Sequence, residues 1–481
     1  MSDRLGSAAG DQSKKPPRRV LFVTGKLAEP ALRRVLSDMA PPFPYDVAVL
    51  GITVAALMTT AWIARHLDAL PDDTDLVLIP GLCEGDPEII REKVGRRVVK
   101  GPKDLREIPR YFGHQTPRDY GAWDIEIVAE INNVPRLTRE ETRRAAEYFR
   151  DAGADVIDLG CTPGLPFPHL GDIVRELVSA GMRVSIDSFD GAEIRAGVAA
   201  GAELVLSVNS SNLDVAADLA ATGARAVVVP DAGESFESID RTLTTLDRLG
   251  VRYVIDPVLE PIGFGFMASL ERYAEARRRY PDAELMMGIG NITELTAADS
   301  TGVNALLIAI CQELGIRTVL TTEVIPWARG SVREIGIARQ LMHHAITAHT
   351  VPKHLDDRLV TIKDAAIFAY SEEELRDLQR RITDPNFRIF ADRDVITVLN
   401  RDHFVRGTDI QDIFAQLGVT EATHAFYLGK ELAKARLAIT LGKTYRQEGS
   451  LSWGYLTPPD DVKSEHVRLT QRSARANRPL R

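Results

Sequence analysis

Eight short apolar runs, each followed by a helix-length segment, occupy residues 125–347. Runs of four to seven residues rich in Val, Ile and Leu are typical of buried strands. Helix-length connections between such strands make them parallel. Eight consecutive strand–helix units predict a closed (β/α)₈ barrel, whereas an open doubly wound sheet would usually have fewer strands. The expected strands are IEIVAEI (125–131), ADVIDLG (154–160), MRVSIDS (182–188), ELVLSVN (203–209), RAVVVPD (225–231), RYVIDPV (252–258), ELMMGIG (284–290) and RTVLTTE (317–323).

The expected fold class is α/β, with this barrel at 120–352 and a further domain on each side. Residues 1–18 are rich in Ser, Gly, Lys and Pro, which predicts a disordered N-terminus. Shorter strand–helix alternation predicts a small α/β domain at 19–115. Mixed strand and helix patterns predict an α+β domain at 355–465, with one strand in LDDRLVTIKD (355–364), and a basic tail follows at 466–481.

Composition narrows the class of protein. A chain of 481 residues is long enough for two or three domains. A net charge of -9 argues against a nucleic-acid-binding surface. Three widely separated cysteines (Cys83, Cys161 and Cys311) give neither a disulfide framework nor zinc-ligand spacing. There is no apolar leader or membrane-length run, so we expect a cytoplasmic protein that binds small molecules and neither nucleic acid nor membrane.

Polar side chains follow nearly every expected barrel strand. Chemistry in such barrels collects beyond the carboxyl ends of the strands, so these groups should share one pocket. Burying them without partners would cost a few kcal/mol each, which a ligand with NH, NH₂ and carbonyl edges would offset. A self-satisfied polar network is the alternative for any single residue, but the whole set favours a binding site. The residues are Asn132, Asn133, Asp158, Asp187, Asn209, Asp231, Asp256, Asn291 and Glu323.

The motifs GADVIDLG, VSIDS, VLSVN and VIDPVLEPIGFGF, between Glu126 and Thr350, resemble the pterin-binding barrel family. That family contains dihydropteroate synthase and the corrinoid-linked methyltetrahydrofolate methyltransferases. With a domain on each side of the barrel, the chain is similar to dihydropteroate synthase-related proteins of archaea and methylotrophic bacteria. Those proteins are associated with tetrahydromethanopterin biosynthesis and one-carbon metabolism.

The resemblance implies a role for each matching residue. The pyrimidine edge of the pterin would be held by Asp187, Asn209 and Asp256, and Asp158 stands where the family has its strand-two aspartate. Asn132 matches the asparagine that meets pyrophosphate and its Mg²⁺ in the synthase. The loop after strand six would cover the ring with the residues Phe264, Gly265 and Phe266.

Three basic groups of the synthase are missing. Strand seven ends in GIGNITELT, with Asn291 and no lysine, and this asparagine is the methyltransferase pattern. Strand eight ends in LTTE instead of Arg-x-His, and the second loop has Thr162 and Pro163 without arginine. Departure of pyrophosphate needs positive charge. Arg329, Lys26 or a metal ion remain as its candidate sources.

Three functions stay open at this point. The leading hypothesis is that the chain joins a dihydropterin-methyl pyrophosphate to an arylamine in tetrahydromethanopterin synthesis, with Asn132, Asn291 and Arg329 taking part in the reaction. The second is methyl transfer from a reduced pterin, which would need a separate corrinoid partner. The third is a non-catalytic pterin-binding or scaffold protein. The outer domains could close over the barrel, form a homodimer or carry a second activity.

Overall fold

The eight apolar runs form the parallel strands of one barrel, as the sequence predicts. The computed structural model describes residues 19–457, apart from 69, 103–104, 106–107, 113–119, 235, 354, 366–369 and 393. The sheet order is β10-β9-β8-β7-β6-β5-β12-β11, and a parallel bridge from Ile255 to Leu285 joins its two edges. The strands are β5 (Glu126–Ile131), β6 (Val156–Gly160), β7 (Val184–Asp187), β8 (Leu204–Val208), β9 (Arg225–Val228), β10 (Tyr253–Ile255), β11 (Met286–Gly288) and β12 (Thr318–Thr321).

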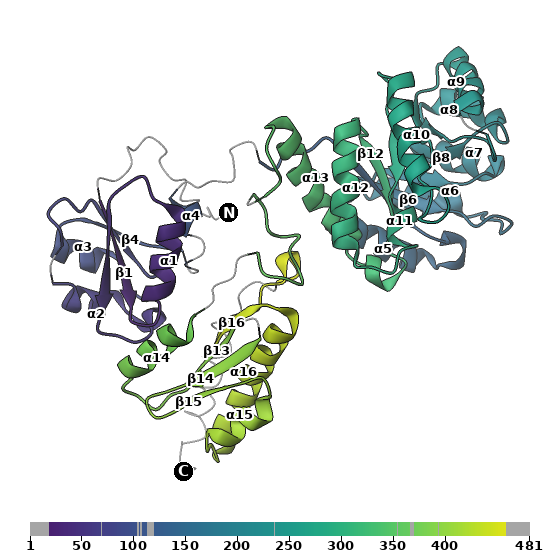
Figure 1. The fold of residues 1–481 in the computed structure, drawn as a ribbon. Coiled ribbons are helices and arrows are strands. Elements are labelled where there is room, and N and C mark those ends of the chain that lie inside the picture. Colours follow the sequence, from purple (N-terminus) through teal and green to yellow (C-terminus); the bar gives the residue numbers. More distant parts are fainter. Residues whose placement is uncertain are drawn as a thin grey trace, which may run out of the picture. The chain divides into compact units, whose positions relative to one another are not determined.

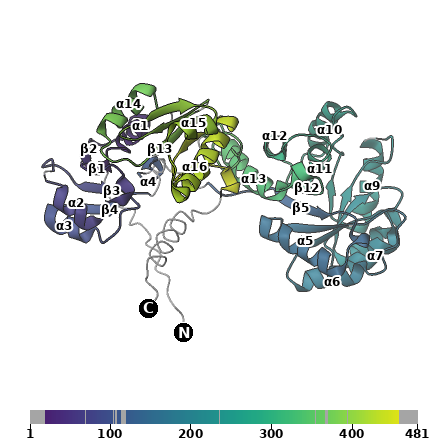
Figure 2. The same cartoon turned by 90° about the horizontal axis from the view of Figure 1, so that it is seen from below.

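Helices surround these strands (Figure 2). The first of them starts with a capping box, in which Thr138 and Glu141 each satisfy the other's backbone N–H. Residues 213–215 form a 3₁₀ turn before α8. The helices are α5 (Arg139–Ala152), α6 (Leu170–Ser179), α7 (Gly191–Ala199), α8 (Ala216–Thr222), α9 (Phe236–Leu249), α10 (Phe266–Arg279), the short α11 (Gly290–Thr293), α12 (Ser300–Leu314) and α13 (Ser331–Thr347).

Side chains alternate between the inside and the outside of the barrel, because strand residues have a period of two. Outward residues pack under the helices in one large core. Inward residues form a separate apolar layer across the barrel, to which β7 contributes the buried hydroxyl of Ser185 instead of an apolar group. This layer separates the two ends of the barrel. Its members are Val128, Val156, Leu204, Leu206, Val227, Val254, Met286 and Leu320.

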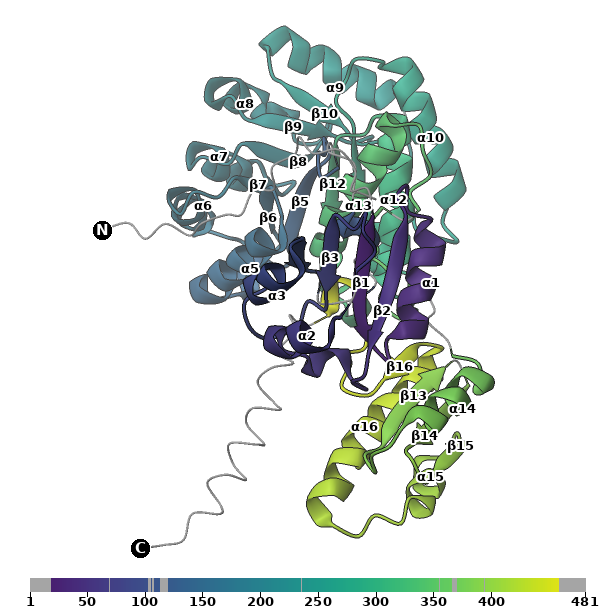
Figure 3. The ribbon, with the colours of Figure 1, turned by 90° about the vertical axis from the view of Figure 1, so that its left-hand side faces the viewer.

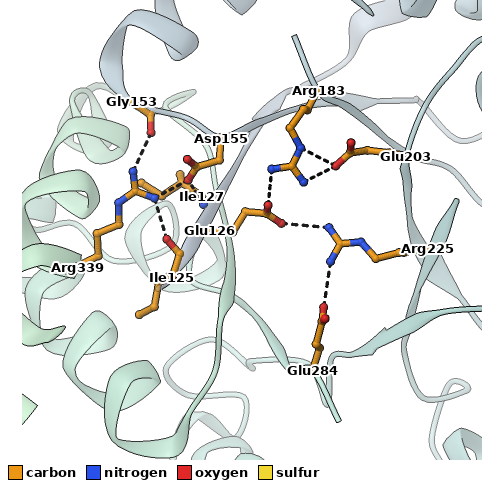
Figure 4. Close-up of polar contacts among 10 residues, drawn as sticks. All are labelled: Ile125, Glu126, Ile127, Gly153, Asp155, Arg183, Glu203, Arg225, Glu284 and Arg339. Carbon is orange, nitrogen blue, oxygen red and sulfur yellow. Dashed lines mark hydrogen bonds and ion pairs between the residues drawn. The ribbon is translucent and has the colours of Figure 1, made fainter. Parts of the chain in front are cut away.

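Below the apolar layer, at the amino ends of the strands, charged side chains are paired with one another (Figure 4). Glu126 binds both Arg183 and Arg225, at 2.5 and 3.2 Å. Arg183 also pairs with Glu203, and Arg225 with Glu284 at 3.0 Å. Positive and negative side chains alternate in this network and neutralise one another. We therefore assign a structural role to the amino end of the barrel.

Arg339 ties the last barrel helix to the first two strands. From α13 its guanidinium donates to the carbonyl of Ile125 at 2.7 Å, to the carboxylate of Asp155 and to the carbonyl of Gly153 (Figure 4). It also lies 4.6 Å from the centre of the Trp123 ring. The Arg339 side chain is only 6% exposed. The buried Arg339 side chain thus joins the last helix of the barrel segment to its beginning.

Arg339→Met should therefore loosen the barrel. The change leaves the Asp155 carboxylate without its cation, and breaking such a buried pair costs about 3 kcal/mol. Hydrogen exchange measured by mass spectrometry should show faster exchange in β5, β6 and α13. Arg183→Met is the matched control, because its side chain is 44% exposed and its loss should cost less than about 1 kcal/mol. Equal effects of the two variants would contradict this assignment.

The chain divides into two compact units, Asp119–Leu359 and Met1–Arg118 with Val360–Arg481. The second unit holds two sheets (Figure 3). One is parallel, in the order β2-β1-β3-β4, and the other is antiparallel, in the order β15-β14-β13-β16. Its elements are β1 (Val20–Gly25), α1 (Glu29–Met39), β2 (Tyr45–Leu50), α2 (Thr60–His66), β3 (Leu76–Ile79), α3 (Glu88–Val94), β4 (Arg97–Lys100), α4 (Ile108–Tyr111), α14 (Glu372–Arg381), β13 (Arg388–Asp392), β14 (Val395–Leu399), β15 (Phe404–Gly407), α15 (Ile410–Gln416), α16 (Ala422–Leu441) and β16 (Thr444–Arg446).

The two sheets of this unit share a small core. Leu27, which follows β1, packs with Leu375 and Leu378 of α14 and with Phe390 of β13 (Figure 1 shows α14 beside both sheets). The fold class is confirmed, with a central barrel and separate smaller sheets. The domain boundaries stay a prediction, and residues 1–18 and 466–481 lie outside the described residues.

The strand expected in LDDRLVTIKD is wrong. Residues 355–364 form turns and bends. The carbonyls of Thr361 and Lys363 accept hydrogen bonds from the fully buried ammonium of Lys443, and Asp364 accepts from Thr444. These backbone groups are satisfied by side chains, so the segment needs no neighbouring strand. None of the described helices combines the length and apolar character needed to cross a membrane.

Candidate functional site

Three carboxyl groups lie together above the apolar layer, on β5, β6 and β7. Glu130 is paired across the sheet with Asp158, and Asp187 with Gly160. Asp158 is fully buried, and its Oδ1 accepts a 2.6 Å hydrogen bond from Ser185. Its Oδ2 is buried with no partner among the described residues. An unpaired buried oxygen is costly, which marks this end of the barrel as a place where a ligand would bind.

The environment of this cluster favours the protonated acids. Burial, together with Asp187 and Glu294, raises the pKa of Glu130 to about 7. Burial and the other two acids raise the pKa of Asp158 well above its usual range. The pKa of Asp187 is also raised by burial, against a hydrogen bond from Ser207. In the described part of the chain, the charges that shift these three groups are all negative.

Glu130 was missed at the sequence level because it lies inside a strand and not at its end. Its signal was nevertheless present in IEIVAEI. Val128 faces the barrel interior, so Glu130, two residues later, must do so as well. Alternation along each strand would have identified it.

A second polar group lies across β10 and β11. Oδ1 of Asp256 accepts hydrogen bonds from the amide of Val258 at 2.8 Å and from the hydroxyl of Tyr273. Oδ2 remains and faces Gly288: a Cβ at Gly288 would meet only this oxygen, at 4.0 Å, and Nδ2 of Asn291, at 3.7 Å. Two predicted site residues thus lie around the position of Gly288. Burial raises the pKa of Asp256 to about 6, although Tyr273 and Val258 partly offset it.

Backbone strain collects at the same end of the barrel. Val258, Ser207 and Asn133 have φ of 69°, 66° and 54° and follow or end barrel strands. A positive φ is costly for a β-branched residue such as Val258. Arg272 holds that loop by donating to the carbonyls of Pro257 and Val258, at 2.8 and 2.6 Å. Strain maintained by such contacts is typical of functional sites.

Three predicted site asparagines are engaged in local hydrogen bonds. Nδ2 of Asn291 donates to the carbonyl of Leu259 at 2.8 Å. Oδ1 of Asn132 accepts a hydrogen bond from the Thr322 hydroxyl, which joins β5 to β12. Oδ1 of Asn209 accepts from the amide and the hydroxyl of Ser211, at 2.9 and 2.7 Å. The amides of Asn132 and Asn209 are therefore oriented by the fold. Their NH₂ groups, and the second lone pair of Oδ1 in Asn132, are left to meet a ligand.

The loop after β10 carries exposed apolar side chains. Phe264 is 80% exposed, Gly265 has a φ of 115°, and Phe266 packs partly against the outer core. Loops after four other strands also expose apolar groups, so the acidic opening has an apolar rim. These groups suit the faces of a flat ring. The rim residues are Leu165, Phe189, Ile262, Phe264, Met267, Leu295, Val324 and Trp327.

Three residues at the strand ends are directed elsewhere. The exposed Arg329 acts on the phenol of Tyr148 of α5 and is not among the charges that shift the pKa values of the acids. Glu323 accepts hydrogen bonds from Tyr148 and from the amide of Val332, at 2.9 and 3.0 Å. Asp231 pairs with Arg241 and accepts from Ser210. The structure therefore does not bring Arg329 to the acids.

The side chains do not form a metal site by themselves. No group of three or more His, Cys, Asp or Glu residues in the described ranges is arranged to hold an ion. Oδ1 of Asn132, the predicted Mg²⁺ contact, is already an acceptor for Thr322. Cys161 is not a nucleophile, because burial and nearby acids raise the pKa of its thiol far above neutrality.

The raised pKa values predict that the protein becomes less stable as pH rises. Glu130 keeps its proton in the folded chain up to about pH 7, whereas the unfolded chain loses it near its ordinary value of about 4.5. The stability contributed by the Glu130 proton should therefore be lost between about pH 4.5 and 7. The free energy of unfolding of Glu130→Gln, measured with urea, should fall less over this range. The exposed Glu234→Gln is the control, and parallel profiles for wild type and Glu130→Gln would rule this account out.

Two family models match the chain, both outside the barrel unit. A family of unknown function (DUF6513) matches residues 18–103, and a model described as PterinBD-DUF4346 matches residues 392–448. An uncharacterized protein of Methanocaldococcus jannaschii is 27% identical over 90% of this chain and 99% of its own length.

Similar solved structures include a dihydropteroate synthase from Coxiella burnetii in complex with pteroic acid. It is 15% identical, with a TM-score of 0.39, over 47% of this chain and 94% of its own. A dihydropteroate synthase from Xanthomonas albilineans in complex with 7,8-dihydropteroate is 18% identical, with a TM-score of 0.37, over 47% and 93%.

Proposed function

We propose that the barrel binds a reduced pterin at its carboxyl end and transfers a group to or from it. The observation that carries the proposal is the pair of polar groups around Gly288, Oδ2 of Asp256 and Nδ2 of Asn291, together with the buried Oδ2 of Asp158, which has no partner among the described residues. A 2-amino-4-oxopyrimidine ring offers two N–H donors side by side, which one carboxylate can accept together. The apolar rim would cover the faces of that ring.

In this proposal each residue has a defined task. Asp256 is held by Tyr273 and Val258, so its Oδ2 needs no rearrangement to accept an N–H. Asp187 and Asn209 contact the ring from β7 and β8, with Asp158 below them. Phe264 and Phe266, on either side of Gly265, cover the ring from the loop after β10.

The reaction that we propose is condensation of a dihydropterin-methyl pyrophosphate with an arylamine, as in tetrahydromethanopterin synthesis. The amine nitrogen attacks the exocyclic CH₂, the C–O bond breaks, and pyrophosphate leaves with that electron pair. Developing negative charge needs a cation, and Arg329, in the loop after β12, is the candidate that we propose, although it acts on Tyr148 and not on the acids. Mg²⁺, if it enters with pyrophosphate, could take one ligand from Asn132. No group of acids in the described residues provides its full coordination.

Methyl transfer from a methylated reduced pterin is the second candidate. It is favoured by Asn291 and by the purely negative charges that act on Glu130, Asp158 and Asp187, since an anionic leaving group would be repelled there. This reaction has no pyrophosphate to stabilise. Its acceptor would be a separate corrinoid protein.

Binding of 6-hydroxymethyl-7,8-dihydropterin tests the site itself. Asp256→Asn should weaken binding about ten- to a hundredfold, because Val258 and Tyr273 hold Oδ1 and the amide would turn an NH₂ donor, in place of the acceptor Oδ2, toward the N–H of the ring. Asp231→Asn is the matched control: it is also an acid at a strand end, but it is paired with Arg241 and should bind normally. Equilibrium dialysis measures both. Failure of the wild type to bind, or equal losses in both variants, would refute a pterin site.

Pyrophosphate release distinguishes the two reactions. The condensation hypothesis predicts release from the dihydropterin-methyl pyrophosphate only when an arylamine is present, and a reduction of at least tenfold in Arg329→Ala. Arg333→Ala is the control, since Arg333 also acts on Tyr148 from the start of α13. If pterin binds and no pyrophosphate appears, condensation is excluded, and methyl transfer and non-catalytic pterin binding remain.

A further inference from the structure

The carboxyls of Glu130, Asp158 and Asp187 form a cluster that cannot be fully ionised. They lie on three neighbouring strands, directly above the apolar layer of the barrel. The ionisable groups that face Glu130 are Asp158 from β6, Asp187 from β7 and Glu294 after α11. All are acids, and the thiol of Cys161, beside the cluster, stays neutral. Like charges in a poorly solvated space cannot all be present at once, so the cluster retains at least one proton.

Packing fixes where Glu130 lies. A Cβ on Gly160 would come within 2.5 Å of Oε1 of Glu130, so the glutamate lies across β6 in the space that a side chain there would fill. Its backbone carbonyl is 3.2 Å from the Thr322 hydroxyl. The carboxyl group is therefore positioned by the fold beside Asp158, whose Oδ2 lacks a partner among the described residues.

Access to solvent distinguishes the three acids. Asp158 is fully buried, whereas Glu130 and Asp187 are partly exposed. A proton on Asp158 can reach solvent only through its neighbours. Of the two partly exposed acids, Asp187 already accepts a hydrogen bond from Ser207, which favours its ionised form. Glu130 is thus the member that exchanges a proton with solvent.

We infer that a pterin displaces a proton from this cluster when it binds, and that Glu130 is the group that gives it up. The inference rests on the proposed function. The N–H edge of the ring needs acceptors, and a protonated carboxyl would turn a donor toward a donor. The O–H bond of the Glu130 carboxyl breaks, its proton passes to buffer, and the cluster accepts N–H in its place. No other bond changes.

The consequence is an affinity that depends on pH. Release of one proton on binding makes the dissociation constant fall up to about tenfold for each pH unit, until Glu130 is ionised in the free protein. Burial raises the pKa of Glu130 to about 7 and that of Asp256 to about 6. The change in affinity between pH 6 and 7 therefore reports the ionisation of Glu130.

Equilibrium dialysis with 6-hydroxymethyl-7,8-dihydropterin, from pH 5.5 to 8, tests this on the full chain. The wild type should bind severalfold more tightly at pH 7 than at pH 6, with little change above pH 7.5. Glu130→Gln should lose this dependence between pH 6 and 7, while Asp231→Asn should keep it. Calorimetry at pH 6.5 in two buffers of different ionisation enthalpy should show proton release by wild type and little by Glu130→Gln.

Each outcome decides the matter. Binding by the wild type with no pH dependence, or the same dependence in Glu130→Gln, would overturn the proton linkage and leave the pterin site standing. Absence of binding at every pH would overturn both proposals together. If Asp231→Asn also lost the pH dependence of binding, that dependence could not be assigned to the cluster of Glu130, Asp158 and Asp187.

Discussion

The apolar layer across the barrel is the constraint from which the rest of the site follows. Alternating strand residues place Val128, Leu206, Met286 and their neighbours in the interior, where they leave no path for water or counter-ions between the two ends. Charged groups must therefore be balanced at each end separately. The charges are balanced in different ways at the two ends of the barrel.

At the amino ends of the strands every acid of the central network has an arginine partner. Glu126 lies between Arg183 and Arg225, and Arg339 binds Asp155 behind them (Figure 4). At the carboxyl ends the acids instead face one another. Their imbalance must be compensated by protons or by a ligand with N–H donors, because the described part of the chain offers these acids no cation. Stability is thus concentrated at one end and binding at the other.

The loop after β10 differs between its start and its tip. The loop after β10 is held by Arg272 at its start, where Val258 adopts a positive φ, but its tip carries the exposed Phe264. Near Asp256 the loop is rigid, which keeps the carboxylate aimed at the space over Gly288. Further out, the side chain of Phe264 is 80% exposed and so packs little against the rest of the chain. A rigid base with an adaptable rim is well suited to a flat ligand.

The sequence alone determined the barrel, because strand length, strand composition and helix spacing are local properties of the chain. It also pointed to Asp158, Asp187 and Asp256 as candidate site residues, since each is an acid within or directly after an apolar run. Only the tertiary structure decided what surrounds them. In the folded chain Arg329, Asp231 and Glu323 contact other partners, and Glu130 lies beside Asp158. Residues 355–364 form turns and bends whose carbonyls accept hydrogen bonds from Lys443. Partners and solvation depend on contacts between residues far apart in sequence, which no local pattern records.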